Sequence, residues 1–160
     1  MHESFGTNGR LTEIQSAIGR LQIKRMPEWS RKRQENSKQI RGVCKTFSSL
    51  RVPQVPDYIE HACYKHYVFV RPNELKPGWT RDRIISEINQ LGVPCYSGGC
   101  PEVYMEEAFD GTDWRPKNRL PIAKELGETS LMFLVHPTLT ELEIDKTCEA
   151  IKQVIKIASL

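Results

Sequence analysis

The chain has 160 residues, of which 39% are hydrophobic and 27% charged, with a formal net charge of +3. This length suits one domain with its own core, and the composition is ordinary for a soluble globular protein. No apolar run is long enough to span a bilayer, and the first residues lack the basic and apolar regions of a secretory signal. We therefore expect a cytoplasmic protein without a membrane segment.

The five cysteines are odd in number and scattered, and none stands at Cys-x-x-Cys spacing. This pattern argues against a disulfide framework and a structural zinc site. Cys95 and Cys100 are the closest pair, but we expect no metal ligand among the cysteines. They are expected to be buried or part-buried free thiols. The set comprises Cys44, Cys63, Cys95, Cys100 and Cys148.

Positive charge is concentrated in residues 20–45, where nine Lys or Arg face only Glu28 and Glu35. Nucleic-acid binding would require a recognisable module or interleaved aromatic side chains, and this segment offers only Trp29. We therefore expect no nucleic-acid partner, and a solvated helix face or a face towards an acidic subunit explains the charges. RNA binding through this segment stays as an alternative, and it predicts an affinity that falls steeply with salt.

The first motif runs from Gly6 to Gln15 and reads Gly-Thr-Asn-Gly-Arg-Leu-Thr-Glu-Ile-Gln. Thr12 and Gln15 have the spacing of a capping box, which predicts that a helix begins after Thr12. The loop would then present the amide of Asn8 and the guanidinium of Arg10 beside the positive end of a helix dipole, an arrangement that favours phosphate. A plain turn before a capped helix explains the same residues.

Apolar residues recur at three and four residue spacings after this cap, which predicts an amphipathic helix. Because proline removes a helical donor, we expect a break or kink near Met26, with Pro27 opening a second helix towards Phe47. The apolar face of the first helix comprises Leu11, Ile14, Ala17, Ile18, Leu21 and Met26. The core face of the second comprises Ile40, Val43, Cys44 and Phe47.

The middle of the chain predicts two strands with a helix between them. Alternating residues from 64 to 70 predict the clearest strand, covered on both faces or at an edge. Thr80 is expected to cap a helix that Gly92 ends, and residues 93–96 follow as a short strand. Pro101 then predicts a helical run over residues 103–109.

The last third begins with a loop over residues 110–120. A short helix is expected from Pro121 to Leu126, stopped by Gly127, and then a buried strand over residues 129–135. Thr140 and Glu143 form a second capping box before an amphipathic final helix. This order predicts an α+β fold, with helices packed on a small mixed or antiparallel sheet.

The opening block resembles the Gly-x-Asn-x-Arg-(Met/Leu)-x-Glu-x-Gln-(Ala/Ser)-Ala pattern of the DegT-like sugar aminotransferases. The segment from His61 to Val70 is similar to the family's His-x-x-Tyr-x-x-Tyr segment, and residues 91–94 resemble its Leu-x-x-Gly-Ile/Val stretch. Residues 120–144 are similar to its final strand, His-Pro turn and last helix. The opening block matches at Gly6, Asn8, Arg10, Glu13, Gln15 and Ala17.

This resemblance covers nearly all of the chain but only about the last two-fifths of a family member. It implies the small C-terminal domain of the aspartate-aminotransferase fold over residues 48–160, with residues 1–47 as a cofactor-contacting loop and interdomain or dimer helices. In the family, the lysine that holds pyridoxal phosphate and the acidic residue that pairs with its ring nitrogen lie upstream of the Gly-x-Asn motif. We therefore expect this chain to be a C-terminal fragment that lacks the N-terminal pyridoxal-phosphate domain, and we expect no catalytic residue in it.

The resemblance also implies roles for individual residues. Asn8 is expected to reach the cofactor phosphate of the neighbouring subunit in a homodimer. Arg10 is expected to support that phosphate or an anionic substrate group, or alternatively to pair with Glu13 or the partner chain. Tyr96-Ser97-Gly98-Gly99 stands where many relatives carry a Tyr-Pro-rich segment. It is a candidate substrate contact, although an unliganded turn would have the same sequence.

Three further residues are expected to play no catalytic part. Lys65 lacks the context of the family's lysine and is expected to be solvated or snorkelling. His61 and His136 are expected to be structural, because a His-Pro after a buried strand more often fixes a turn.

The function that the resemblance implies is transfer of an amino group from an amino acid, usually glutamate, to a nucleotide-linked keto-sugar. Such a reaction belongs to amino-sugar, surface-polysaccharide or secondary-metabolite biosynthesis. The chain alone is expected to be inactive and not to retain the cofactor. The alternatives are amination of a keto-cyclitol, and a stand-alone phosphate-binding or assembly module without catalysis.

Overall fold

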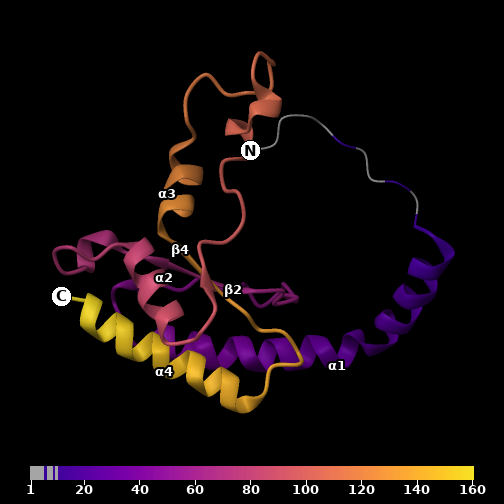
Figure 1. Cartoon of the computed structure of the whole chain (residues 1–160), viewed down its shortest axis with the longest axis horizontal. Helices are drawn as coiled ribbons and strands as arrows, with labels where there is room; N and C mark the ends of the chain where they lie inside the picture. Colours follow the sequence, from indigo (N-terminus) through magenta and orange to yellow (C-terminus); the bar gives the residue numbers. More distant parts are fainter. Residues whose placement is uncertain (1–5, 7–8, 10) are drawn as a thin grey trace.

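The computed structural model describes Gly6, Gly9 and residues 11–160 (Figure 1). Its helices are α1 (Glu13–Cys44), α2 (Arg81–Gln90), α3 (Pro121–Thr129) and α4 (Glu141–Ala158), with short 3-10 turns at Pro72–Glu74, Val103–Met105 and Glu107–Phe109. Its strands are β1 (Leu50–Arg51), β2 (His66–Val70), β3 (Cys95–Tyr96) and β4 (Ser130–Phe133). They form an antiparallel sheet in the order β1-β2-β4-β3. The predicted α+β fold is confirmed.

The register of β2 and β4 sorts their side chains onto two faces. His66 lies opposite Phe133 and Val68 opposite Leu131, and all four side chains are buried. The three apolar members belong to the core cluster, which α1, α2 and α4 complete with Ile40, Cys44, Ile84, Ile88, Ile144, Ile151 and Ile155. Tyr67 and Phe69 point to the opposite face, where they line a pocket with Leu126 of α3. β2 is therefore an interior strand with one face in the core, and not an edge.

The second helix expected to open at Pro27 does not form, because Pro27 lies inside one continuous helix, α1. Only one donor is lost at a proline, and the helix continues by bending around its ring. Figure 1 shows this bend: the second part of α1 runs beside α4, and the first turns of the helix point in another direction. The second part carries the predicted core face, with Ile40 and Cys44 fully buried and Val43 and Phe47 packed against the core.

Helix α3 runs two residues past Gly127, which was expected to end it. This glycine meets a packing requirement, because a Cβ there would lie 2.4 Å from Cγ of Pro101. Residues 103–109 form two 3-10 turns instead of one helix. Among the described residues, no helix is both long and apolar enough to cross a bilayer.

The capping box at Thr140 gives a first test of local stability. The Thr140 side chain accepts from the amide of Glu143, and the Glu143 carboxylate accepts from the amide of Thr140 at 2.8 Å. Thr140→Ala should cost about 1 kcal/mol of unfolding free energy, because it removes one partner of this pair. Urea denaturation measures the loss. Thr140→Ser retains the acceptor oxygen and should remain within about 0.5 kcal/mol of the wild type, and an equal loss in both variants would contradict the assignment.

Candidate functional site

The first candidate site is the start of α1. The expected capping box is confirmed: the amide of Thr12 donates to Oε1 of Gln15 at 2.9 Å, and the amide of Gln15 donates to Oγ1 of Thr12 at 3.2 Å. Asn8 and Arg10 lie outside the described residues. Gly6, Gly9 and Leu11 on either side of them are exposed, and an added Cβ at either glycine would meet no atom within 4 Å.

The described residues before α1 leave space in which a phosphate could bind. The described residues that bracket Asn8 and Arg10 are open to a ligand or another chain, and an amide with a guanidinium supplies donors that phosphate oxygens accept. The fixed cap at Thr12 keeps the entry to α1 in one place. The roles expected for Asn8 and Arg10 at the phosphate of pyridoxal phosphate therefore stay a prediction.

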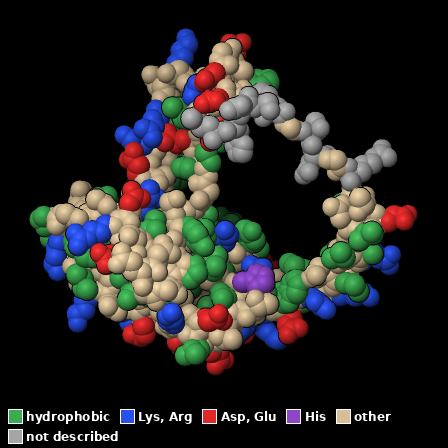
Figure 2. Space-filling model, viewed as in Figure 1, with side chains coloured by type: hydrophobic (Ala, Val, Ile, Leu, Met, Phe, Trp, Pro, Cys, Tyr) green, Lys and Arg blue, Asp and Glu red, His purple; other side chains and the backbone are tan. Residues whose placement is uncertain are grey.

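The first part of α1 also presents a bare apolar face. The side chains of Leu11, Ile14, Ile18, Leu21 and Met26 are 45–75% exposed. Figure 2 shows green hydrophobic side chains along this part of the helix, between blue and red charged ones. A contiguous apolar face of this kind marks an interaction surface. The sequence predicted the face, but among the residues that the structure describes no core covers it.

The second candidate site is the turn Tyr96–Gly99 at the end of β3. Tyr96 lies opposite Met132 in the sheet, and Met132 lies opposite Tyr67 on its other side. Gly98 has a φ of +99°, and a Cβ there would lie 2.6 Å from Cε1 of Tyr67. Glycine is thus required both by the backbone and by the Tyr67 ring. The hydroxyl of Ser130 donates to the carbonyl of Ser97, which ties the turn to β4.

A pocket of about 210 Å³ adjoins this turn. Its walls are the rings of Tyr67 and Phe69, the backbone of Gly99, and Pro101 and Leu126. Tyr96 is half exposed and does not line this pocket. A small pocket with apolar walls and phenol and hydroxyl groups at its rim can hold a compact polar ligand by stacking and hydrogen bonding. Of the four predicted residues, Ser97 and Gly99 line this pocket together with Tyr67, and Gly98 lies against the Tyr67 ring. The sequence alone did not indicate this contact with Tyr67.

A hydrogen-bonded cluster fixes the segment that follows the turn. Arg119 donates from Nε to Glu102 Oε1 at 2.7 Å and from Nη2 to Oε2 at 2.5 Å. The hydroxyl of Tyr104 donates to Glu102 at 2.7 Å and accepts from the amide of Leu120 at 2.8 Å. These bonds join the two ends of the loop between residues 102 and 120. The turn Tyr96–Gly99 is therefore held at two points, by the bond from Ser130 to Ser97 within it and by the Glu102 cluster after it.

This cluster predicts a pH dependence. The hydrogen bonds that Glu102 accepts, first from Arg119 and second from Tyr104, lower its pKa from 4.5 to about 2. Because the folded pKa is depressed, its stabilisation is complete above the ordinary pKa and is lost as the pH falls from about 4.5 towards 2. Glu102→Gln should therefore melt at a lower temperature than the wild type at pH 7, with the gap narrowing towards pH 3. A gap that stays constant over this range would contradict the assignment.

The histidines and Lys65 have neighbours that fit structural roles. Nδ1 of His61 accepts from the amide of Cys63 at 3.0 Å, and Nδ1 of His136 accepts from the amide of Thr138 at 3.3 Å. Each imidazole thus fixes a local turn. The ammonium of Lys65 lies 5.5 Å from the ring centre of Tyr64, just before β2.

Four of the five cysteines are buried as expected, but Cys100 is exposed. Burial raises the pKa of Cys44 and Cys95 to about 12, so both remain protonated thiols. The thiol of Cys100 donates to Glu106 at 3.3 Å. Within the described part of the chain, no cluster of three His, Cys, Asp or Glu side chains could hold a metal ion.

Comparison with known proteins gives this geometry its context. Residues 1–152 match the sequence model of the DegT/DnrJ/EryC1/StrS aminotransferase family. The chain belongs to this family. The aminotransferase of Psychrobacter cryohalolentis has a crystal structure that covers 98% of this chain with 54% identity and a TM-score of 0.88. The spore coat polysaccharide biosynthesis protein SpsC of Bacillus subtilis is 22% identical over 96% of the chain.

The same fold occurs in the GDP-4-keto-6-deoxy-D-mannose-3-dehydratase of E. coli, whose structure holds hydrated pyridoxal phosphate. It is 22% identical, covers 92% of this chain and has a TM-score of 0.75. The chain spans only 39% of SpsC, 42% of the Psychrobacter enzyme and 37% of the dehydratase. It therefore has the fold of one part of a pyridoxal-phosphate-dependent aminotransferase, as the resemblance implied.

Proposed function

We propose that the chain is the C-terminal part of a pyridoxal-phosphate-dependent aminotransferase. In this proposal, the enzyme moves an amino group from glutamate to a keto-sugar carried on a nucleotide. The family match over residues 1–152 is the observation that carries it. Two facts of this chain support it: it spans about two-fifths of its relatives, and α1 exposes an apolar face that has no cover here.

Each end of the proposed site has a defined task. Pyridoxal phosphate, when bound, supplies the electron sink for the transfer of the amino group. The amide of Asn8 donates to its phosphate across a dimer interface, and this donor positions the phosphate without itself titrating. Arg10 adds a charged donor to the phosphate or to an anionic group of the substrate.

The turn Tyr96–Gly99 forms part of the substrate wall in this proposal. Its shape is fixed before the substrate arrives, since Tyr67 fills the space under Gly98 and Ser130 holds the carbonyl of Ser97. A wall that is already ordered loses little entropy on binding. The first part of α1 packs against the remainder of the enzyme or its dimer partner and buries the apolar face there.

The experiment compares this chain with the protein that also carries the coding region upstream of Met1. Both are incubated with pyridoxal phosphate, glutamate and nucleotide-linked keto-sugars, and amination is followed by mass spectrometry. The longer protein should aminate a sugar and the 160-residue chain should not. An upstream region without a cofactor domain, or amination of a keto-cyclitol in place of any sugar, would overturn the proposal in this form.

A further inference from the structure

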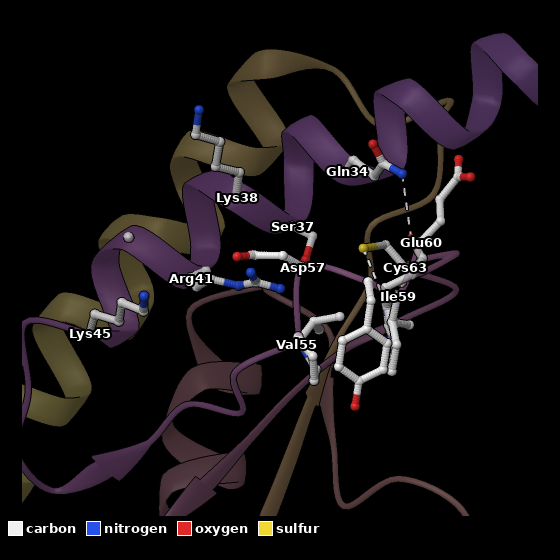
Figure 3. Close-up of a pocket in the computed structure, with 14 residues that line it drawn as sticks. Gln34, Ser37, Lys38, Arg41, Lys45, Val55, Asp57, Ile59, Glu60 and Cys63 are labelled. Carbon is white, nitrogen blue, oxygen red and sulfur yellow. Dashed lines mark hydrogen bonds between the residues drawn. The ribbon is translucent and has the colours of Figure 1, made fainter.

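A surface pocket of about 900 Å³ lies between the second part of α1 and the loop that joins β1 to β2 (Figure 3). Ser37, Lys38, Arg41 and Lys45 of α1 line one side. The loop lines the other with largely apolar residues, namely Val55, Pro56, Tyr58 and Ile59, together with Asp57 and Glu60. The pocket thus has a cationic wall and an apolar wall.

Among the residues that line this pocket, Arg41 carries a buried side-chain nitrogen without a hydrogen-bond partner. Figure 3 shows its side chain leaving α1 and extending into the pocket beside Asp57. Its Nε is buried and forms no hydrogen bond. Among residues 11–160, no other group forms an ion pair or a hydrogen bond with its guanidinium. Because a buried donor without an acceptor costs free energy, an anion that reached Arg41 would recover that loss.

The neighbouring charges point to the same kind of ligand. Lys38 and Lys45 lie three residues before and four after Arg41, which places all three cations on one side of the helix. Asp57 and Glu60 oppose them, so the side chains that line the pocket carry a net charge of +1 (three cations against two carboxylates). Ser37 adds a hydroxyl, which also bonds to Nδ1 of His66 at 2.8 Å.

We propose that this pocket binds a small phosphate monoester that carries a planar apolar group. A guanidinium presents a planar fork that takes two phosphate oxygens, and the adjacent ammonium groups balance the second negative charge. The apolar wall and the exposed ring of Tyr58 would cover the organic part by stacking. No lining residue belongs to the turn Tyr96–Gly99, and the proposal stands whether or not the chain serves an aminotransferase.

The test is calorimetric titration of the 160-residue chain with phenyl phosphate, with benzoate and inorganic phosphate as the comparison ligands. Phenyl phosphate should bind at one site and more tightly than either. Arg41→Gln should weaken it about tenfold or more, since hydrogen bonds to charged groups are the strong ones. Asp57→Asn removes a repelling charge and should tighten binding.

Two control variants separate this pocket from other sources of binding. Lys24→Gln removes a positive charge from the exposed first part of α1, outside the pocket, and should leave the affinity within about twofold because of screening by salt. Lys156→Gln removes an exposed positive charge from α4, also outside the pocket, and should likewise leave phenyl phosphate binding within about twofold. If Arg41→Gln does not fold, Lys38→Gln and Lys45→Gln, both at exposed positions, provide the same comparison.

The pKa of His66 provides an independent readout. Burial of the imidazole, and next the positive charge of Arg41, lower this pKa to about 4. Phosphate bound at Arg41 would offset that charge, so the pKa of His66 measured by NMR should rise when phenyl phosphate saturates the site. The proposal is overturned by any of three results: no saturable binding, equal losses in Arg41→Gln and Lys24→Gln, or benzoate binding as tightly as phenyl phosphate.

Discussion

In the longer aminotransferase, Asn8→Ala should weaken retention of pyridoxal phosphate about tenfold to a hundredfold, which is the range expected for one hydrogen bond to a charged phosphate. Thermal stability of the chain should stay the same, because the variant removes a ligand contact and no part of the core. Cofactor release during dialysis, followed by absorbance, gives the dissociation constant.

A matched control for this variant is Asn118→Ala, which removes the same amide from an exposed loop position. It should leave the cofactor affinity at the wild-type value. Equal affinity in the Asn8→Ala and wild-type enzymes would refute the role of Asn8, whereas equal losses in both variants would show that the effect does not come from the motif.

Gly98→Ala should lower the free energy of unfolding by about 2 kcal/mol or more, which combines backbone strain with overpacking. The strain arises because φ is +99° at this position, and the overpacking because the new methyl group would lie 2.6 Å from the Tyr67 ring. To relieve this contact, either Tyr67 or the turn must move. In the longer enzyme, the Michaelis constant for the sugar substrate should therefore rise as well.

Gly99 provides the control, because a Cβ there would meet no atom within 4 Å. Gly99→Ala should therefore leave the stability within about 0.5 kcal/mol of the wild type. Urea denaturation of both variants measures the difference. If the two glycines tolerate alanine equally well, then the structure assigned to this turn is wrong.

Local signals in the sequence predicted the helix caps and the core faces. Thr12, Thr80 and Thr140 each cap the helix they were expected to cap, because a cap depends on residues within one turn. The core residues Ile40, Ile84 and Ile151 follow from helical spacing in the same way.

Contacts between residues far apart in the sequence could not be predicted from these local signals. Gly127 was interpreted as a helix stop, although its contact is with Pro101, 26 positions earlier in the chain. The partner of Glu102 is Arg119, whose approach depends on the fold of the loop between them. The pocket beside Arg41 forms only because residues 55–63 fold back against α1, although the positive charge concentrated in residues 20–45 did indicate a charged helix face.

Hydrogen exchange across residues 6–26 in the longer protein tests the central claim most directly. The account predicts that these residues exchange rapidly in the 160-residue chain and are protected in the longer protein. Removal of pyridoxal phosphate should then speed exchange mainly at residues 6–12. Equal exchange of residues 11–26 in both proteins, or exchange of residues 6–12 that does not respond to the cofactor, would contradict the account.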